Sequence, residues 1–156
     1  MRDRSGVTLI EMVIIVAVLG ILLGIGLVVL PNDHAAVSQA ANGFARQFPR
    51  ARIEALKSDK FAGIAVSTSG DGSYYVCVDQ NDDRQCSTSE AVQTVDMGKG
   101  ANSKVRLAST SSGFTQFMFD PRGIPMSAGG SVTFSNAAGT YSVTVAFTAA
   151  GEASVQ

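Results

Sequence analysis

Hydrophobic residues follow three different patterns along the chain, and the first is an unbroken apolar run near the N-terminus. Met12 to Leu30 carries no charge, and the 24 residues from Val7 to Leu30 include one charged side chain, Glu11. At about 1.5 Å per residue such a helix reaches roughly 36 Å, and a bilayer core is about 30 Å thick. The run predicts a transmembrane helix over residues 7–30.

The second pattern follows Pro31 and has the spacing of an amphipathic helix. Apolar residues recur in steps of three and four over residues 31–60, which places them on one face of a helix. They are Val37, Ala41, Phe44, Phe48, Ala51 and Ala55. Pro49 should kink this helix or split it after Phe48, because proline lacks the backbone donor that a helix interior needs. We expect the apolar stripe to pack against another element.

The third pattern covers residues 61–156 and consists of short β-rich runs separated by turn residues. The runs are GIAVST, SYYVCVD, AVQTVDM, KVRLAS, FTQFMF, SVTFSN and TYSVTVAFT. Alternation is clearest in Tyr141, Val143, Val145 and Phe147, which would share one sheet face. These patterns together predict an α+β fold, in which a long N-terminal helix packs on an antiparallel β-sheet head.

Charges beside the apolar run predict its orientation. Arg2 and Arg4 precede the run with Asp3 as the one opposing charge, and basic residues favour the cytoplasmic side. A cleaved secretory signal is disfavoured, because the run is too long and LPNDHAA is a poor cleavage site. We therefore expect a single-pass protein of the inner (plasma) membrane, with a cytoplasmic N-terminus and an exported head.

Composition narrows the possible functions. The chain has 12 basic and 13 acidic residues and a net charge of −1, so it lacks the basic excess of a dedicated nucleic-acid binder. The one histidine, His34, lies next to the apolar run, and no catalytic triad order or CxxC motif occurs. An enzyme is not expected, and no catalytic residue, cofactor or metal site is assigned.

Cys77 and Cys86 both lie in the part expected to be exported. Disulfides form and persist outside the cytoplasm, so a bridge between these two residues is the natural interpretation. Two buried free thiols are the alternative.

The stretch SGVTLIEMVIIVAVLGILLGIG resembles the N-terminus of type IV pilins and of type II secretion pseudopilins. The resemblance implies that a prepilin peptidase cuts after Gly6, removing residues 1–6 as a leader peptide. It also implies N-terminal methylation of the new first residue, Val7, where the family usually has Phe. Glu11 then occupies the position of the glutamate that the family uses in assembly.

Electrostatics suggests a role for Glu11 in such a protein. Cleavage would create an amino group four residues before it, and a carboxylate within a membrane needs a partner or a role. The amino terminus of a neighbouring subunit is a suitable partner; alternatively, Glu11 reaches the headgroup region unpaired. Gly20 and Gly24 have the small-xxx-small spacing that allows close helix packing, although ordinary glycine tolerance explains them equally well.

Two motifs in the head resemble the GspH/FimT-like branch of minor pilins and minor pseudopilins. They are ARIEAL at the end of the amphipathic helix and FMFDPRGIPMSAGGSVTF further on. The matching residues are Arg52, Glu54, Ala55, Phe119, Pro121 and Gly123. The resemblance implies that the F-x-x-x-G turn joins two strands of the sheet, and an ordinary β-turn would have the same residues.

Two clusters of polar and charged residues could either bind a ligand or simply be solvated. Asp79, Asn81, Asp82 and Asp83 lie between the cysteines and could bind calcium, but a solvated hairpin tip explains them without a metal. The basic residues could contact phosphate or could form a solvated helix face. These are Arg46, Arg50, Arg52, Lys57 and Lys60.

The sequence therefore predicts a minor pilin or pseudopilin that assembles into a type IV pilus or a type II secretion pseudopilus. Expected partners are other pilin or pseudopilin subunits, the prepilin peptidase, the inner-membrane assembly platform, and the membrane before assembly. The head would be periplasmic or extracellular, and then displayed at the surface or tip of a filament, which in the type II system serves protein secretion. A DNA-binding minor pilin for natural transformation is the alternative function, and an anchored ligand-binding module that never polymerises is a third.

Overall fold

The computed structural model describes residues 9–28, 33–111 and 113–156, and side chains over these ranges except residues 22–28. The chain divides into two compact units, Met1–Asn32 and Asp33–Gln156. We describe each unit by itself. The predicted leader, residues 1–6, and Pro31, which separates the first two patterns, lie outside the described residues.

The described part of the N-terminal unit is the helix α1, which covers Leu9–Val28. Its residues are Leu, Ile, Val, Ala, Met and Gly apart from Glu11, which lies in the first turn. A carboxylate in that position interacts favourably with the positive end of the helix dipole.

The head, residues 33–156, begins with two consecutive helices, α2 (Asp33–Ala45) and α3 (Gln47–Ser58). The predicted apolar stripe is confirmed, because each of its six side chains is at most 1% exposed. Helical spacing alone therefore located the face of α2 and α3 that packs on the rest of the head.

The predicted position of the helix break was wrong by two residues. The interruption lies at Arg46, and Pro49 is the third residue of α3. The first four backbone amides of a helix have no carbonyl acceptor within that helix. A proline at one of these positions therefore removes no hydrogen bond of the helix. Pro49 would also clash with the carbonyl of Ala45, which is where α2 ends. Proline thus ends the helix before it rather than after Phe48.

Eight strands follow, and seven of them coincide with the predicted runs. They are β1 (Ala62–Ser67), β2 (Ser73–Val78), β3 (Ala91–Asp96), β4 (Val105–Thr110), β5 (Gln116–Phe119), β6 (Gly130–Asn136), β7 (Ser142–Phe147) and β8 (Ala153–Val155). Short 3₁₀ helices occupy Thr88–Glu90 and Gly100–Asn102. The strand β8 was not predicted, because three residues are too few for an alternating pattern to be recognised.

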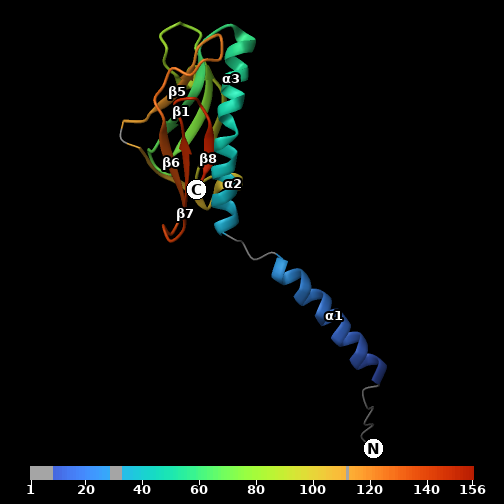
Figure 1. The fold of residues 1–156 in the computed structure, drawn as a ribbon. Helices are drawn as coiled ribbons and strands as arrows, with labels where there is room; N and C mark the ends of the chain where they lie inside the picture. Colours follow the sequence, from blue (N-terminus) through green and yellow to red (C-terminus); the bar gives the residue numbers. More distant parts are fainter. Residues whose placement is uncertain (1–8, 29–32, 112) are drawn as a thin grey trace, which may run out of the picture. The chain divides into compact units, whose positions relative to one another are not determined.

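The predicted α+β fold with an antiparallel β-sheet head is confirmed, and its strands form two antiparallel sheets. Sheet A has the order β3-β2-β1-β5, and sheet B has the order β4-β6-β7-β8. Backbone hydrogen bonds join them where β4 passes the β1–β2 turn: Leu107 N donates to Asp71 O at 2.9 Å. Figure 1 shows α2 and α3 running along one side of both sheets.

Aromatic rings from the helices connect the two sheets. Phe48 contacts Phe117 of sheet A, with ring centroids 5.3 Å apart, and Phe147 of sheet B at 5.0 Å. One turn earlier, Phe44 contacts Tyr74 of sheet A at 5.1 Å and Phe134 of sheet B at 5.6 Å. Such ring pairs add to the stabilisation from buried area. The core of the head therefore lies between α2–α3 and both sheets.

Replacing Phe48 by alanine should lower the free energy of unfolding by about 3–5 kcal/mol, because it removes the ring that contacts both sheets. Ile53→Ala on the same helix is the matched control, since Ile53 is 60% exposed; it should change stability by at most about 0.5 kcal/mol. Denaturant unfolding of the full chain in detergent, followed by near-ultraviolet circular dichroism, measures both. Equal effects of the two substitutions would contradict the assignment of the core.

Candidate functional site

The predicted N-terminal site residues all belong to the first unit. Gly6 and Val7 lie outside the described residues, whereas Glu11 is exposed in the first turn of α1. Gly20 and Gly24 both lie within α1 and are one turn apart, so they share a face of the helix. A Cβ at Gly20 would meet no atom within 4 Å, which leaves this part of the helix surface open.

Apart from Glu11, the surface of α1 is apolar on every described side. Its large hydrophobic side chains are between 49% and 83% exposed from Leu9 to Ile21. They are Leu9, Ile10, Met12, Val13, Ile14, Ile15, Val16, Val18, Leu19 and Ile21. A helix that is hydrophobic all round is normally surrounded by other apolar groups.

In the part of the chain that the structure describes, no helix meets the combined length and hydropathy needed to cross a membrane. The predicted span, residues 7–30, extends beyond the described residues at both ends.

In the head, the predicted F-x-x-x-G motif forms a tight turn organised by Asp120. Asp120 Oδ1 accepts hydrogen bonds from the backbone amides of Arg122 at 2.9 Å and Ile124 at 2.8 Å. Its Oδ2 accepts from the Arg122 guanidinium at 3.0 Å. Gly123 adopts a positive φ of 72°, a backbone conformation that is energetically unfavourable for residues with a Cβ. The nearly buried carboxylate of Asp120 therefore stabilises the turn through these hydrogen bonds.

The turn does not join two strands of one sheet, as the resemblance implied. It reverses the chain so that Pro125 forms a β-bridge with Phe119 at the end of β5, and the next strand, β6, belongs to sheet B. The turn is thus the point where the chain leaves sheet A.

The two head motifs contact each other. A Cβ at Gly123 would lie 3.2 Å from Arg52 Cγ and 3.3 Å from Leu56 Cγ. The missing side chain at Gly123 therefore makes room for the side chains of α3. The end of the ARIEAL helix therefore packs directly on the F-x-x-x-G turn.

Hydrogen bonds keep two carboxyl groups of the head ionised. The Ile124 amide, together with the Arg122 guanidinium, holds the pKa of Asp120 below its usual value. The Ser87 hydroxyl and the Gln80 amide lower the pKa of Glu90 in the same way. Both effects arise because the donors stabilise the charged form.

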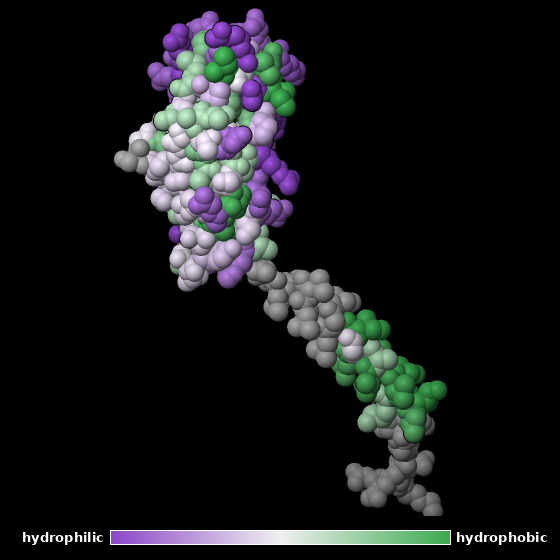
Figure 2. Space-filling view, in the orientation of Figure 1, coloured by the Kyte–Doolittle hydropathy of each residue, from purple (hydrophilic) through white to green (hydrophobic). Residues whose placement is uncertain are grey.

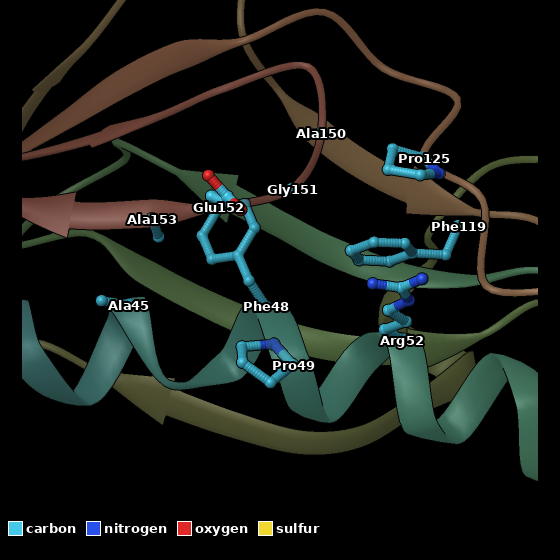
Figure 3. A pocket seen from close by; sticks show the side chains of 10 residues that line it. All are labelled: Ala45, Phe48, Pro49, Arg52, Phe119, Pro125, Ala150, Gly151, Glu152 and Ala153. Carbon is cyan, nitrogen blue, oxygen red and sulfur yellow. The ribbon is translucent and has the colours of Figure 1, made fainter.

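A groove of about 600 Å³ lies between the first turn of α3, the Phe119–Pro125 bridge and the turn that joins β7 to β8. Figure 3 shows Phe48, Pro49 and Arg52 on the helix side, with Phe119 and Glu152 across from them. The remaining lining residues are Ala45, Pro125, Ala150, Gly151 and Ala153. Sequence analysis missed this groove, because Ala150–Ala153 has the composition of an ordinary surface turn.

Cys77 and Cys86 form a disulfide, with Cα atoms 5.6 Å apart, that closes the acidic loop. Within this loop Asp79 is fully buried, and its Oδ2 accepts a hydrogen bond from the Arg84 amide at 2.7 Å. Its Oδ1 accepts from the Asn81 amide at 3.2 Å. The described residues hold no group of three or more His, Cys, Asp or Glu arranged to bind a metal ion. The buried carboxylate thus shapes the loop itself.

The basic cluster is spread along the outside of the helices. The Arg50 guanidinium donates to Gln93 of β3, and Lys60 Nζ donates to the Gln80 carbonyl at 3.0 Å. His34, the lone histidine, stacks on Tyr141 with ring centroids 4.0 Å apart. The Arg50 contact thus joins α3 to sheet A, and the His34 contact joins the start of α2 to the residue that precedes β7.

An apolar N-terminal helix, followed by an amphipathic helical segment packed on an antiparallel head, defines a pilin-like subunit. Comparison with protein families agrees with this class. The family "Type II transport protein GspH" matches residues 40–151, and the "Prokaryotic N-terminal methylation motif" matches residues 1–27. The chain belongs to the GspH family, as the head motifs predicted.

Individual relatives give the same result. The pilin-like protein PilA1 of Thermus thermophilus is 40% identical over 124 residues, which cover 78% of this chain and 80% of PilA1. Two crystal structures of the type IV minor pilin FimU from Pseudomonas aeruginosa share the fold at 14% identity. Their TM-scores are 0.56 and 0.54; they cover 77% and 76% of this chain, and 87% and 91% of the FimU chains.

The protein is therefore a minor pilin or pseudopilin, a structural subunit rather than an enzyme, that assembles with other pilin subunits. The methylation motif indicates a pilin anchored through its N-terminus. The comparisons do not support the alternative of DNA binding.

The ionised form of Asp120 should stabilise the head in a pH-dependent way. Its pKa is lower in the folded chain, so its contribution is present above about pH 4 and is lost as the pH falls further. Asp120→Asn keeps a hydrogen-bond acceptor but removes the charge. The stability difference between wild type and this variant should therefore shrink below about pH 4.

Thermal unfolding of the full chain between pH 3 and pH 7 measures this difference. Asp59→Asn is the matched control, because it removes an exposed carboxylate outside the turn. A wild-type and Asp120→Asn difference that stays constant over the whole pH range would contradict the role of the ionised carboxylate.

Proposed function

We propose that the chain is made as a precursor, cleaved between Gly6 and Val7, and then built through α1 into a type IV pilus or a type II secretion pseudopilus. The observation that carries this proposal is the match of residues 1–27 to the N-terminal methylation motif. That segment contains Gly6, Val7 and Glu11 in the order that the family requires. A prepilin peptidase would remove residues 1–6 and methylate Val7.

Glu11 acts in this proposal as an assembly residue. Cleavage creates a positively charged amino group at Val7, and a neighbouring subunit brings this group to Glu11 during docking. Opposite charges attract strongly where water is excluded, as at the apolar surface of α1. The ion pair between Glu11 and the neighbour's amino group would set the position of each new subunit along the filament axis, because any other position leaves both charges unpaired in apolar surroundings.

The apolar surface of α1 would be covered in two successive ways. Before assembly it lies in the inner membrane, with the N-terminus in the cytoplasm because Arg2 and Arg4 precede it. The assembly platform then transfers it into a bundle of pilin helices. Gly20 and Gly24 would allow a neighbouring helix to approach closely in that bundle.

Mass analysis of the membrane-extracted protein tests the processing step. In cells with an active prepilin peptidase, the chain should begin at Val7 and carry one added methyl group. Gly6→Leu should leave residues 1–6 attached, because the peptidase requires a small residue before the cut, whereas Ser5→Ala should be processed normally. A wild-type chain that still begins at Met1 in such cells would overturn the proposed cleavage.

Replacing Glu11 by alanine tests the assembly step. The variant should still enter the membrane, but its incorporation into sheared filaments should fall by about tenfold or more, because the Val7 amino group loses its partner. Glu11→Asp keeps the charge and should retain part of the incorporation. Immunoblots of sheared and cell-bound fractions measure both, and wild-type incorporation of Glu11→Ala would argue against the pairing.

A further inference from the structure

The outward side of α3 is both basic and apolar. None of its exposed side chains is acidic, and the one acidic residue of the helix, Glu54, is half-buried at its flank. Ile53 and Leu56 are 60% and 53% exposed among these basic groups. We define the basic helix face as Arg46, Arg50, Arg52, Ile53, Leu56 and Lys57. Figure 2 shows dark green apolar groups among purple hydrophilic ones at the end of the head where α3 ends.

The apolar part of this face extends onto the Asp120 turn. Leu56 lies against Gly123, and the neighbouring Ile124 is 50% exposed. Of the six exposed large hydrophobic side chains in the described part of the head, three therefore occur in this region, namely Ile53, Leu56 and Ile124; the others are Val92, Met126 and Val155. Exposed apolar groups that gather in one place usually mark an interaction surface.

The opposite side of sheet A carries acidic groups around Val92, which is 51% exposed. The pairing of Gln93 with Val76 and of Val95 with Tyr74 turns those side chains toward the core. Side chains alternate along a strand, so Thr94 and Asp96 point away from the helices, as does Val92 at the β-bulge. We define the acidic strand face as Val92, Thr94 and Asp96 together with Asp82, Asp83 and Glu90, which come from the segment that the Cys77–Cys86 disulfide and the Tyr75–Cys86 hydrogen bond hold on the same side.

The two faces are complementary in charge. The basic helix face has four cationic side chains, and the acidic strand face has four carboxylates. Lys99, which pairs with Asp96 at 3.1 Å, and the exposed Arg84 next to Asp83 offset two of these carboxylates, so the face keeps a net negative charge. Because the faces lie on opposite sides of sheet A, they cannot neutralise each other within one chain. They can do so between two chains, with Ile53 and Leu56 opposite Val92.

We propose that the basic helix face of one copy docks on the acidic strand face of a second copy. The contact is heterologous, so it leaves one free face of each kind at the ends of a row of heads. Exposed ion pairs are individually weak, and the contact gains strength when α1 holds two heads close together. In this respect it rests on the proposed assembly through α1.

Cysteine cross-linking of the full chain in detergent micelles tests the contact. Ile53→Cys and Val92→Cys copies are mixed and treated with a short thiol cross-linker. The mixture should form a 53–92 linked dimer in about fivefold or greater excess over a mixture in which Ala138→Cys, exposed on the β6–β7 turn, replaces Val92→Cys. The yield should fall as salt is raised, because ions screen exposed charges.

Charge reversal makes the test specific. Lys57→Glu in the Ile53→Cys copy, or Asp96→Lys in the Val92→Cys copy, should each lower the yield about three- to fivefold, and combining the two should restore it. A 53–53 product in excess of the 53–92 product would overturn the heterologous contact. A 53–92 yield no higher than that of the Ala138→Cys control would overturn the proposal. Protection of the Ile53→Cys thiol from alkylation by phosphatidylglycerol vesicles or by duplex DNA would then assign the basic helix face to a membrane or to a nucleic acid instead.

The test separates this inference from the proposed function. Cross-linking in micelles requires neither cleavage at Gly6 nor pairing of Glu11, so a Glu11→Ala copy should cross-link like the wild type. If the Glu11→Ala copy cross-links normally but is not incorporated into filaments, both proposals are supported. If it cross-links normally and is also incorporated normally, only the proposed role of Glu11 is overturned.

Discussion

The contact of two helical phenylalanines with both sheets is the interaction on which the rest of the head depends. Phe44 and Phe48 lie one turn apart on the buried face of α2 and α3, and each contacts a ring from sheet A and a ring from sheet B. The sheets also meet directly, through the rings of Phe117 and Phe147, whose centroids are 5.7 Å apart, and through backbone hydrogen bonds. The helical segment adds the ring contacts that pack both sheets on one side into a single core.

This arrangement divides the helical segment between two roles. Its inner face packs in the core, so the helices can contact other molecules only through the outer face, where α3 carries basic and apolar side chains. The Asp120 turn extends that outer surface, because Gly123 leaves room for Arg52 and Leu56. The motif residues of the family thus support the outer surface of α3 rather than a catalytic centre.

Particular elements show where sequence reasoning succeeded and where it failed. The six-residue stripe was predicted correctly because burial on one side imposes the helical period directly on the sequence. The break near Pro49 was misplaced because proline tolerates the first turn of a helix, and tertiary context decides whether it ends one helix or begins the next. The strand β8 was missed because three residues show no period. The groove beside Pro49 was missed because its walls come from three distant segments.

The sequence by itself determined the class of protein: the apolar run with Glu11, the amphipathic stripe and the β-rich region are local patterns, and each follows from a periodicity or a motif within a few turns of chain. Only the tertiary structure decided that the strands form two sheets, that Arg52 meets Gly123, and that the basic and acidic faces lie on opposite sides of sheet A. These features depend on which distant residues come together. That choice is made by packing of the whole core, and no local pattern encodes it.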